Sequence, residues 1–124
     1  MNNNNNTQQV KIELLQPQFR GVGEVRGFLF NLIKRTPDLA LYEVKTEDEF
    51  GKVVDTHYEV IKVKKVARCI DFDNRIFDQN DLKEVYPKSN DFGKTAWSAF
   101  TLCSALKRYN ELIKKAKKNE SKYN

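Results

Sequence analysis

Apolar residues recur with a helical period near the C-terminal end of the chain. Between residues 102 and 116 they are spaced by three, four and seven positions, so they line one face of an α-helix. Thr101 precedes the run and suits the N-cap position, because its hydroxyl can accept a hydrogen bond from a free amide of the first turn. The pattern predicts an amphipathic helix with an apolar face made of Leu102, Ala105, Leu106, Tyr109, Leu112, Ile113 and Ala116.

The middle of the chain alternates between apolar and polar residues, which is typical of β-strands. Thr36-Pro37-Asp38 and the acidic stretch 46–52, which contains Gly51, are turn sequences that separate the alternating runs. Consecutive strands joined by short turns form an antiparallel meander. We therefore predict three antiparallel strands over residues 23–34, 39–45 and 53–66.

The tripeptide Tyr-Glu-Val occurs in two of these strands, at Tyr42 and at Tyr58. A hairpin centred near Glu49 places Tyr42 opposite Thr56 and Tyr58 opposite Ala40. In that register the two tyrosines are near neighbours on one face of the sheet. Aromatic side chains on an exposed sheet face can stack on unpaired bases, so we predict a stacking role for Tyr42 and Tyr58.

Four shorter runs complete the predicted fold. Residues 10–15 suit an edge strand, while 68–72, 82–86 and 93–100 suit short strands. We predict an α+β fold: a twisted antiparallel β-sheet of four to six strands, arranged as a meander, with one amphipathic C-terminal helix packed on it. The predicted domain covers residues 10–118, after a disordered Asn-rich N-terminus at 1–9 and before a flexible tail at 119–124.

The positive charge of the chain is concentrated in its C-terminal segment. The chain of 124 residues has a formal net charge of +5, yet residues 1–106 contain 15 basic and 15 acidic residues. Residues 107–122 contain seven basic residues against two acidic ones, Glu111 and Glu120. A localised basic strip can act as an electrostatic contact for a negatively charged partner.

Residue types that carry catalysis or bind metals are sparse. His57 is the one histidine and lies within a predicted strand, and Cys69 and Cys103 lack the spacing of a zinc or redox motif. The sequence contains no nucleotide-binding loop, nucleophile elbow or metalloprotease helix. We therefore predict a protein that is not an enzyme and that has no catalytic residue, metal or cofactor.

The acidic stretch from Asp71 to Asp81 is open to three interpretations. It starts like a calcium-binding loop, but Arg75, Ile76 and Leu82 stand where an EF-hand needs an oxygen ligand, a glycine and a glutamate. An EF-hand is thereby excluded. A looser metal site, an acidic contact surface and a plain solvated loop all fit the sequence.

The chain lacks the sequence features of a membrane or secreted protein. No run approaches the roughly 20 apolar residues of a spanning helix, and the N-terminus has no charged and apolar signal segment. The two cysteines are expected to be reduced thiols, with a single structural disulfide as the alternative. We predict a cytoplasmic protein with no membrane partner.

Binding is therefore the class of function that the sequence favours. Basic side chains at the end of the third strand and along the helix could contact phosphates. Phe28, Phe30 and Trp97 are expected in the core. The predicted contact residues for nucleic acid or a partner are Lys62, Lys64, Lys65, Arg68, Lys107, Arg108, Lys114, Lys115, Lys117 and Lys118, with Tyr42 and Tyr58 for stacking.

Six segments of the chain resemble a set of small proteins from phages and mobile elements of Bacteroidetes bacteria. The likeness covers most of residues 18–113 and is carried by QFRGVGEVRGF at 18–28, LYEV at 41–44, HYEV at 57–60, YPKSNDFG at 86–93, AW at 96–97 and ALKRYNEL at 105–112. The Asn-rich start, the acidic stretch and the basic tail depart from the shared pattern. Because those proteins have no known activity, the resemblance implies a phage context rather than a mechanism.

Small accessory phage proteins without catalytic motifs are often inhibitors of host defence. The resemblance therefore implies a non-enzymatic binding protein in the host cytoplasm that engages a host nucleoprotein or its RNA, as an anti-CRISPR protein engages an RNA-guided nuclease. Two alternatives stay open. One is a general accessory protein that binds single-stranded nucleic acid, and the other is a virion or assembly component whose basic tail contacts packaged DNA.

Overall fold

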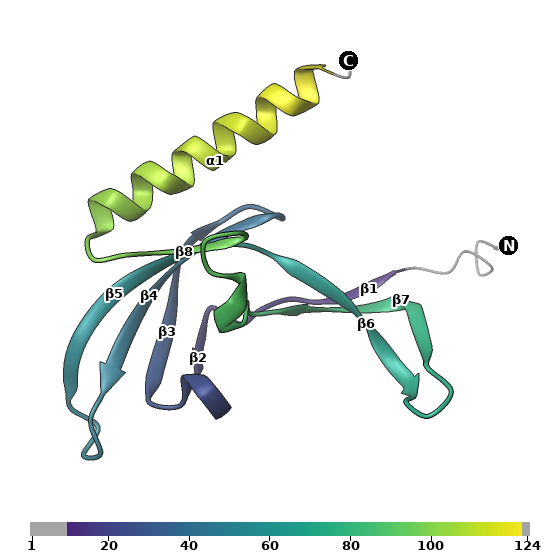
Figure 1. Cartoon of the computed structure of the whole chain (residues 1–124), viewed down its shortest axis with the longest axis horizontal. Coiled ribbons are helices and arrows are strands. Elements are labelled where there is room, and N and C mark those ends of the chain that lie inside the picture. The colour runs from purple at the N-terminus through teal and green to yellow at the C-terminus, as the bar shows by residue number, and fades with distance from the viewer. Residues whose placement is uncertain (1–9, 123–124) are drawn as a thin grey trace, which may run out of the picture. The chain divides into compact units, whose positions relative to one another are not determined.

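The structure, a computed structural model, describes residues 10–122, with side chains as far as residue 118. Within this range the chain forms eight strands in two sheets and one long C-terminal helix (Figure 1). The predicted α+β class and the C-terminal helix are confirmed. The predicted disorder of residues 1–9 and the end of the predicted tail, 123–124, lie outside the described residues.

The chain divides into two compact units, and the predicted domain, residues 10–118, includes residues of both. The first, called the helix unit, comprises residues 16–63 and the chain from residue 87 onward. Its sheet is antiparallel, with the strand order β2-β3-β4-β5-β8. The elements are β2 (Gln18–Arg20), β3 (Phe28–Arg35), β4 (Leu39–Glu47), β5 (Val53–Lys62), β8 (Ala96–Ala99), α1 (Leu102–Lys122) and the 3-10 turns Gly23–Val25 and Ser89–Asp91.

The second unit, called the hairpin unit, comprises residues 10–15 and Lys64–Tyr86. Strands β6 (Lys64–Asp71) and β7 (Ile76–Val85) form an antiparallel hairpin with two shifts of register. The edge strand predicted near the N-terminus is present as β1 (Lys11–Glu13), and it pairs with β7 in parallel. The predicted antiparallel sheet of four to six strands is confirmed as the five-stranded sheet of the helix unit, whereas this second, mixed sheet was not predicted.

The long strand predicted over residues 53–66 is in fact two strands of different sheets. β5 ends at Lys62 and β6 begins at Lys64. The amide of Val63 donates to the carbonyl of Asp38, at a distance of 2.8 Å, so it leaves the β-ladder at this point. A continuous alternation of residues does not reveal such a break, because both strands keep the same period of two.

The predicted register of the β4–β5 hairpin is also wrong. Tyr42 lies opposite Glu59, and Tyr58 lies opposite Glu43. Because pairing partners share a face and the side chains alternate, this odd shift places the two tyrosines on opposite faces of the sheet. The shift arises at the turn, which is centred later than Glu49 and is followed by an irregularity between Val53 and Asp55.

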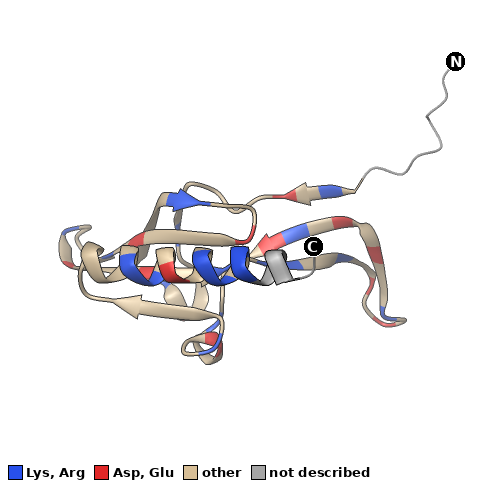
Figure 2. Cartoon of the chain, turned by 90° about the horizontal axis from the view of Figure 1, so that it is seen from above, with Lys and Arg blue, Asp and Glu red and all other residues tan. Residues whose placement is uncertain are grey.

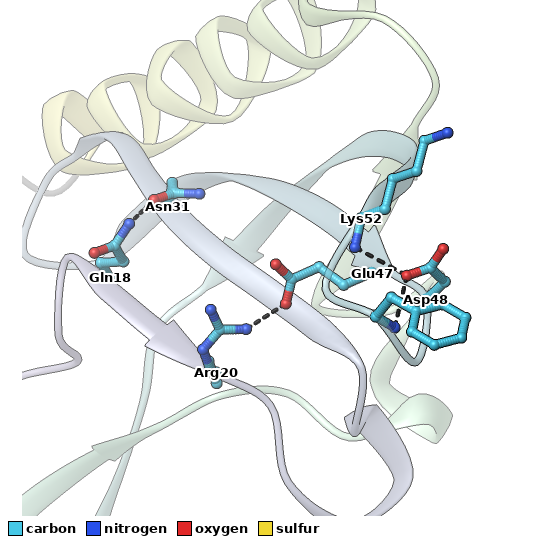
Figure 3. A network of polar contacts seen from close by, with 7 residues as sticks. Gln18, Arg20, Asn31, Glu47, Asp48 and Lys52 are labelled. Atoms are coloured by element: carbon cyan, nitrogen blue, oxygen red, sulfur yellow. Dashed lines mark hydrogen bonds and ion pairs between the residues drawn. The ribbon is translucent and has the colours of Figure 1, made fainter.

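The turn is organised by the carboxylate of Asp48. It accepts hydrogen bonds from the amides of Phe50 and Lys52, each at 2.9 Å (Figure 3). Gly51 has a φ of 81°, a conformation that a residue with a side chain rarely adopts. An Asx-type turn of this kind fixes the loop length and hence the register of the strands that it joins.

Polar side chains also tie the short edge strand β2 to the rest of its sheet. Gln18 donates to the side chain of Asn31 at 2.7 Å, and Arg20 forms an ion pair with Glu47 on β4 (Figure 3). Phe19 lies on the opposite face and stacks on Phe30, with ring centroids 4.6 Å apart. The edge strand therefore contributes polar contacts on one face and core packing on the other.

Helix α1 packs on one face of the sheet through its predicted apolar face. Ala105 and Tyr109 are buried in a cluster with Leu39 and Leu41 of β4 and Val60 of β5. The predicted N-cap is confirmed, since the hydroxyl of Thr101 accepts a hydrogen bond from the amide of Ser104 at 3.1 Å. The backbone of α1 remains helical to Lys122, beyond the domain end predicted at residue 118.

The other face of the sheet carries a second group of large buried side chains. Phe30, Tyr42, Val44 and Ile61 are each almost completely buried there. The prediction that Phe30 belongs to the core is confirmed. Phe28 is half-buried and meets the rings of Phe30 and His57 edge-on.

We predict that Tyr109 dominates the docking of the helix. Its side chain is only 1% exposed. Replacing Tyr109 by alanine should lower the free energy of unfolding by about 4 kcal/mol, because a ring-sized cavity opens between helix and sheet. Tyr109→Phe should change it by less than about 1 kcal/mol, since no hydrogen bond of the hydroxyl is found among the described residues. Urea unfolding followed by circular dichroism measures both, and equal losses would contradict the assignment.

We also predict an acidic titration for Asp71, in the turn of the β6–β7 hairpin. Hydrogen bonds from the side chain and amide of Asn74, and from the amide of Asp73, hold the pKa of Asp71 below its ordinary value of 3.8. A lowered pKa stabilises the turn at higher pH, and this contribution is lost as the pH falls through the pKa of the folded state. Asn74→Ala should raise the pKa toward 3.8. Carbon-detected NMR titration measures it, and an unchanged midpoint would contradict the prediction.

Candidate nucleic-acid interface

Three lysines form a row along the outward face of α1, here called the basic ridge: Lys107, Lys114 and Lys118. All three are exposed, whereas Ala105 and Tyr109 on the opposite side of the helix are buried. The spacing of seven and four residues keeps the ridge on one side of the helix. None of the three lysines forms an ion pair with any side chain that the structure describes. Figure 2 shows the basic residues along α1 when the helix is viewed from above.

Two further predicted contact residues meet at the edge strand β8. Arg108 of α1 lies over the ring of Trp97, with its guanidinium carbon 5.3 Å from the ring centroid. The ammonium of Lys62, at the end of β5, lies 6.0 Å from the same centroid. Cations at these distances are attracted by the negative face of an indole ring. Trp97 therefore holds two basic side chains, one from the sheet and one from the helix, on one surface.

A groove of about 670 Å³ separates the second half of α1 from the end of the sheet. Its apolar walls are contributed by Leu39, Val63, Leu112, Ile113 and Ala116. Three of the predicted contact residues, Lys62, Lys115 and Lys117, line it together with Asp38. The groove therefore continues the basic surface from the helix toward the turn between β3 and β4.

The remaining basic residues of the predicted site lie in the hairpin unit. Lys64 and Lys65 begin β6, opposite Val85 and Glu84 of β7. Arg68 pairs with Asp81 at 2.9 Å and with Glu13 of β1 at 3.5 Å. The guanidinium of Arg68 is thus paired with carboxylates of its own sheet, so Arg68 is less suited to binding a phosphate.

The stacking role predicted for the two tyrosines is not compatible with their burial. Tyr42 is 0% exposed, and its hydroxyl donates to the carbonyl of Gln16 at 3.0 Å. Tyr58 is half-buried on the opposite face, where it packs against the cluster beneath α1. The prediction is wrong for Tyr42, and Tyr58 serves the packing of the helix. The ring of Tyr42 is therefore not accessible to a nucleobase.

The position of Trp97 was not predicted correctly from the sequence, which indicated a place in the core. Trp97 is half-buried on β8, directly paired with Val60 of β5. A helical projection places Arg108 at the margin between the apolar and basic faces, where an aromatic partner on the sheet is the natural neighbour. The identity of that partner depends on strand order, which no local pattern encodes.

The acidic stretch is occupied by structural hydrogen bonds. Asp71 accepts from the amides of Asp73 and Asn74, Asp78 accepts from the amide of Asn80, and Asp81 pairs with Arg68. Among residues 10–122 no three histidine, cysteine, aspartate or glutamate side chains gather as a metal site. Asp71 and Asp78 thus cap turns of the hairpin unit, and Asp81 forms an ion pair there.

Two cysteines and one histidine are the remaining residues of types that commonly carry catalysis or bind metals. Cys69 and Cys103 are both free and exposed, so the disulfide considered as an alternative is absent. His57 contacts the carboxylate of Glu59 through Nε2 at 2.7 Å. No helix in the described part of the chain combines the length and the apolar character that crossing a membrane requires.

Comparison with known proteins finds no matching family model, no matching curated protein and no matching solved structure. The resemblance to phage proteins therefore stays a prediction from the sequence motifs. The geometry of the basic surface supports contact with a polyanion, whereas the phage context depends on the sequence motifs.

We predict a measurable coupling between Arg108 and Trp97. In a double-mutant cycle with Arg108→Ala and Trp97→Leu, the interaction energy from urea unfolding should be about 0.5–1 kcal/mol. The matched cycle with Lys107→Ala and Trp97→Leu should give about zero, because Lys107 points away from the sheet. Equal coupling in the two cycles would show that the ring does not hold Arg108.

Proposed function

We propose that this protein is a non-enzymatic, phage-type binding protein that engages a host nucleoprotein or its RNA in the bacterial cytoplasm, and thereby inhibits a defence nuclease. The observation that carries the proposal is the basic ridge on α1, whose lysines are exposed and free of ion pairs within the described part of the chain. A surface of this kind is suited to a polyanion.

The dimensions of the surface support contact with several phosphates at once. From Lys107 to Lys118 the helix rises by about 16 Å, and the ammonium groups lie on flexible stems that extend the reach. Salt screens charges beyond about 8 Å at physiological ionic strength. Lys114 and Lys118, about 6 Å apart along the helix axis, therefore act together, whereas Lys107 lies about 10 Å from Lys114 and meets a separate phosphate. Lys62, Lys115 and Lys117 extend the same surface into the groove.

The burial of the tyrosines favours a nucleoprotein over a general binder of single strands. Sequence-tolerant binding to single strands commonly combines phosphate contacts with stacking on exposed aromatic rings. Tyr42 is inside the core and Tyr58 is beneath the helix. Lysine contacts alone position a nucleic acid without reading its bases, so selectivity would come from a protein partner that carries the RNA.

We predict that labelled single-stranded RNA binds with a steep dependence on salt. With four to five phosphates neutralised, log affinity should fall with log salt at a slope of about −3. Replacing the ridge lysines Lys107, Lys114 and Lys118 by alanine should reduce the slope to about −1, because each lost phosphate contact removes roughly 0.7. Fluorescence anisotropy across a salt series measures both slopes.

The matched control removes three exposed lysines elsewhere: Lys52 and Lys94 of the helix unit and Lys11 of the hairpin unit. This variant has the same net charge as the ridge variant but an intact ridge, so it should keep a slope near −3. Equal slopes for the two variants would show that binding depends on the net charge of the chain rather than on the lysines of α1. Absence of RNA binding by the unmodified chain at low salt would refute the nucleic-acid part of the proposal.

A further inference from the structure

Strand β5 has an open edge over half its length. It runs from Val53 to Lys62, but β8 pairs only with its residues 58–61. On the other side β4 accompanies β5 along its whole length. Residues 53–57 therefore have a strand on one side and, within residues 10–122, none on the other.

The backbone groups on this edge can be identified from the alternation in an antiparallel ladder. The amide of Lys62 donates to the carbonyl of Thr95, at 2.8 Å, so it points to the side on which β8 lies. Backbone groups point to alternate sides along a regular strand, so the even-numbered residues from Thr56 to Lys62, beyond the irregularity between Val53 and Asp55, share this direction. The amide and carbonyl of Thr56 consequently face the open edge, where a further strand could pair with them.

A pocket of about 260 Å³ lies beside this edge, lined by Asp55, His57, Ser98, Ala99 and Phe100. The carboxylate of Asp55 has no ion-pair partner among the described side chains. Nε2 of His57 is already held by Glu59 at 2.7 Å. Phe100, just beyond the end of β8, is 91% exposed. The pocket thus offers a free carboxylate and an aromatic ring, which suit the cationic head and aliphatic stem of a lysine or arginine.

We infer that this edge is a docking site for an extended segment of a partner protein. The segment adds as a strand beside residues 53–57 of β5 and places a lysine or arginine side chain in the pocket at Asp55. Strand addition supplies main-chain hydrogen bonds, and the pocket selects the side chain. Val54 is exposed next to the edge and favours an apolar neighbour in the added strand.

Charge argues against a second copy of this chain as the occupant. Two copies of residues 53–57 paired fully in antiparallel orientation place Asp55 directly opposite its own symmetry mate. Like charges directly opposite each other destabilise a strand pair. The same carboxylate repels phosphate. This site therefore favours a cationic partner, whereas the basic ridge favours an anionic one.

The first test uses a short labelled peptide of alternating threonine and valine with one central lysine. At millimolar concentration it should shift the amide NMR signals of Val54, Thr56 and Phe100 in the full chain. Asp55→Asn should weaken binding about fivefold, through loss of the ion pair. The matched variant Glu49→Gln, at an exposed acid of the nearby turn, should leave the affinity unchanged. Absence of shifts at these amides, or equal effects of both variants, overturns the inference.

The second test distinguishes strand addition from simple attraction of charge. Two versions of the peptide are methylated on alternate backbone amides, so only one version loses the amides that face β5. The version methylated on the amides that face β5 should lose binding, and the version methylated on the other amides should retain it. Equal binding of both versions overturns the inference. Dimerisation of the chain in sedimentation experiments, with the same amide shifts and no peptide, assigns the edge to a second copy and equally overturns it.

Discussion

The packing of α1 on the sheet is the interaction on which the arrangement of the functional surface depends. Tyr109 and Ala105 are buried against Leu41 and Val60, and this contact fixes the rotation of the helix about its axis. With 3.6 residues per turn, the side chains on the opposite side must then face away from the sheet of the helix unit. The basic ridge is therefore a consequence of the apolar face. The same contact brings Arg108 over Trp97 and opens the groove where α1 passes beyond the sheet.

The register between β4 and β5 decides how the aromatic residues are used. It places Tyr42 on one face, inside a cluster of rings with Phe19 and Phe30, and Tyr58 on the other, beneath α1. Both tyrosines pack within the helix unit, so neither belongs to the basic surface on α1. The same hairpin extends past the end of β8, which creates the open edge beside Asp55. Surfaces of opposite charge, on α1 and on β5, result from one strand pairing and one helix contact.

Local patterns predicted much of the fold, and the errors share one physical origin. The helical period from Leu102 to Ala116 and the cap at Thr101 are local features, and both were predicted. The pairing partner of Tyr42 depends on the geometry of the Asp48 turn, because a register shift of one residue moves every side chain of a strand to the opposite face. The break at Val63 and the parallel pairing of β1 with β7 depend on contacts between distant segments. The ridge lysines were predictable because they follow from the helical period, whereas Trp97 required the strand order.

The most direct test of the account is a residue-resolved map of RNA binding. Amide NMR shifts of the isotopically labelled full chain, recorded while single-stranded RNA is added at low salt, report each segment separately. If the docked helix forms the binding surface, the largest shifts occur along α1 between Lys107 and Lys118 and at Lys62, with little change at Thr56 and Arg68. Shifts confined to the β6–β7 hairpin, or spread evenly over the chain, would contradict the claim that the docked helix forms the binding surface.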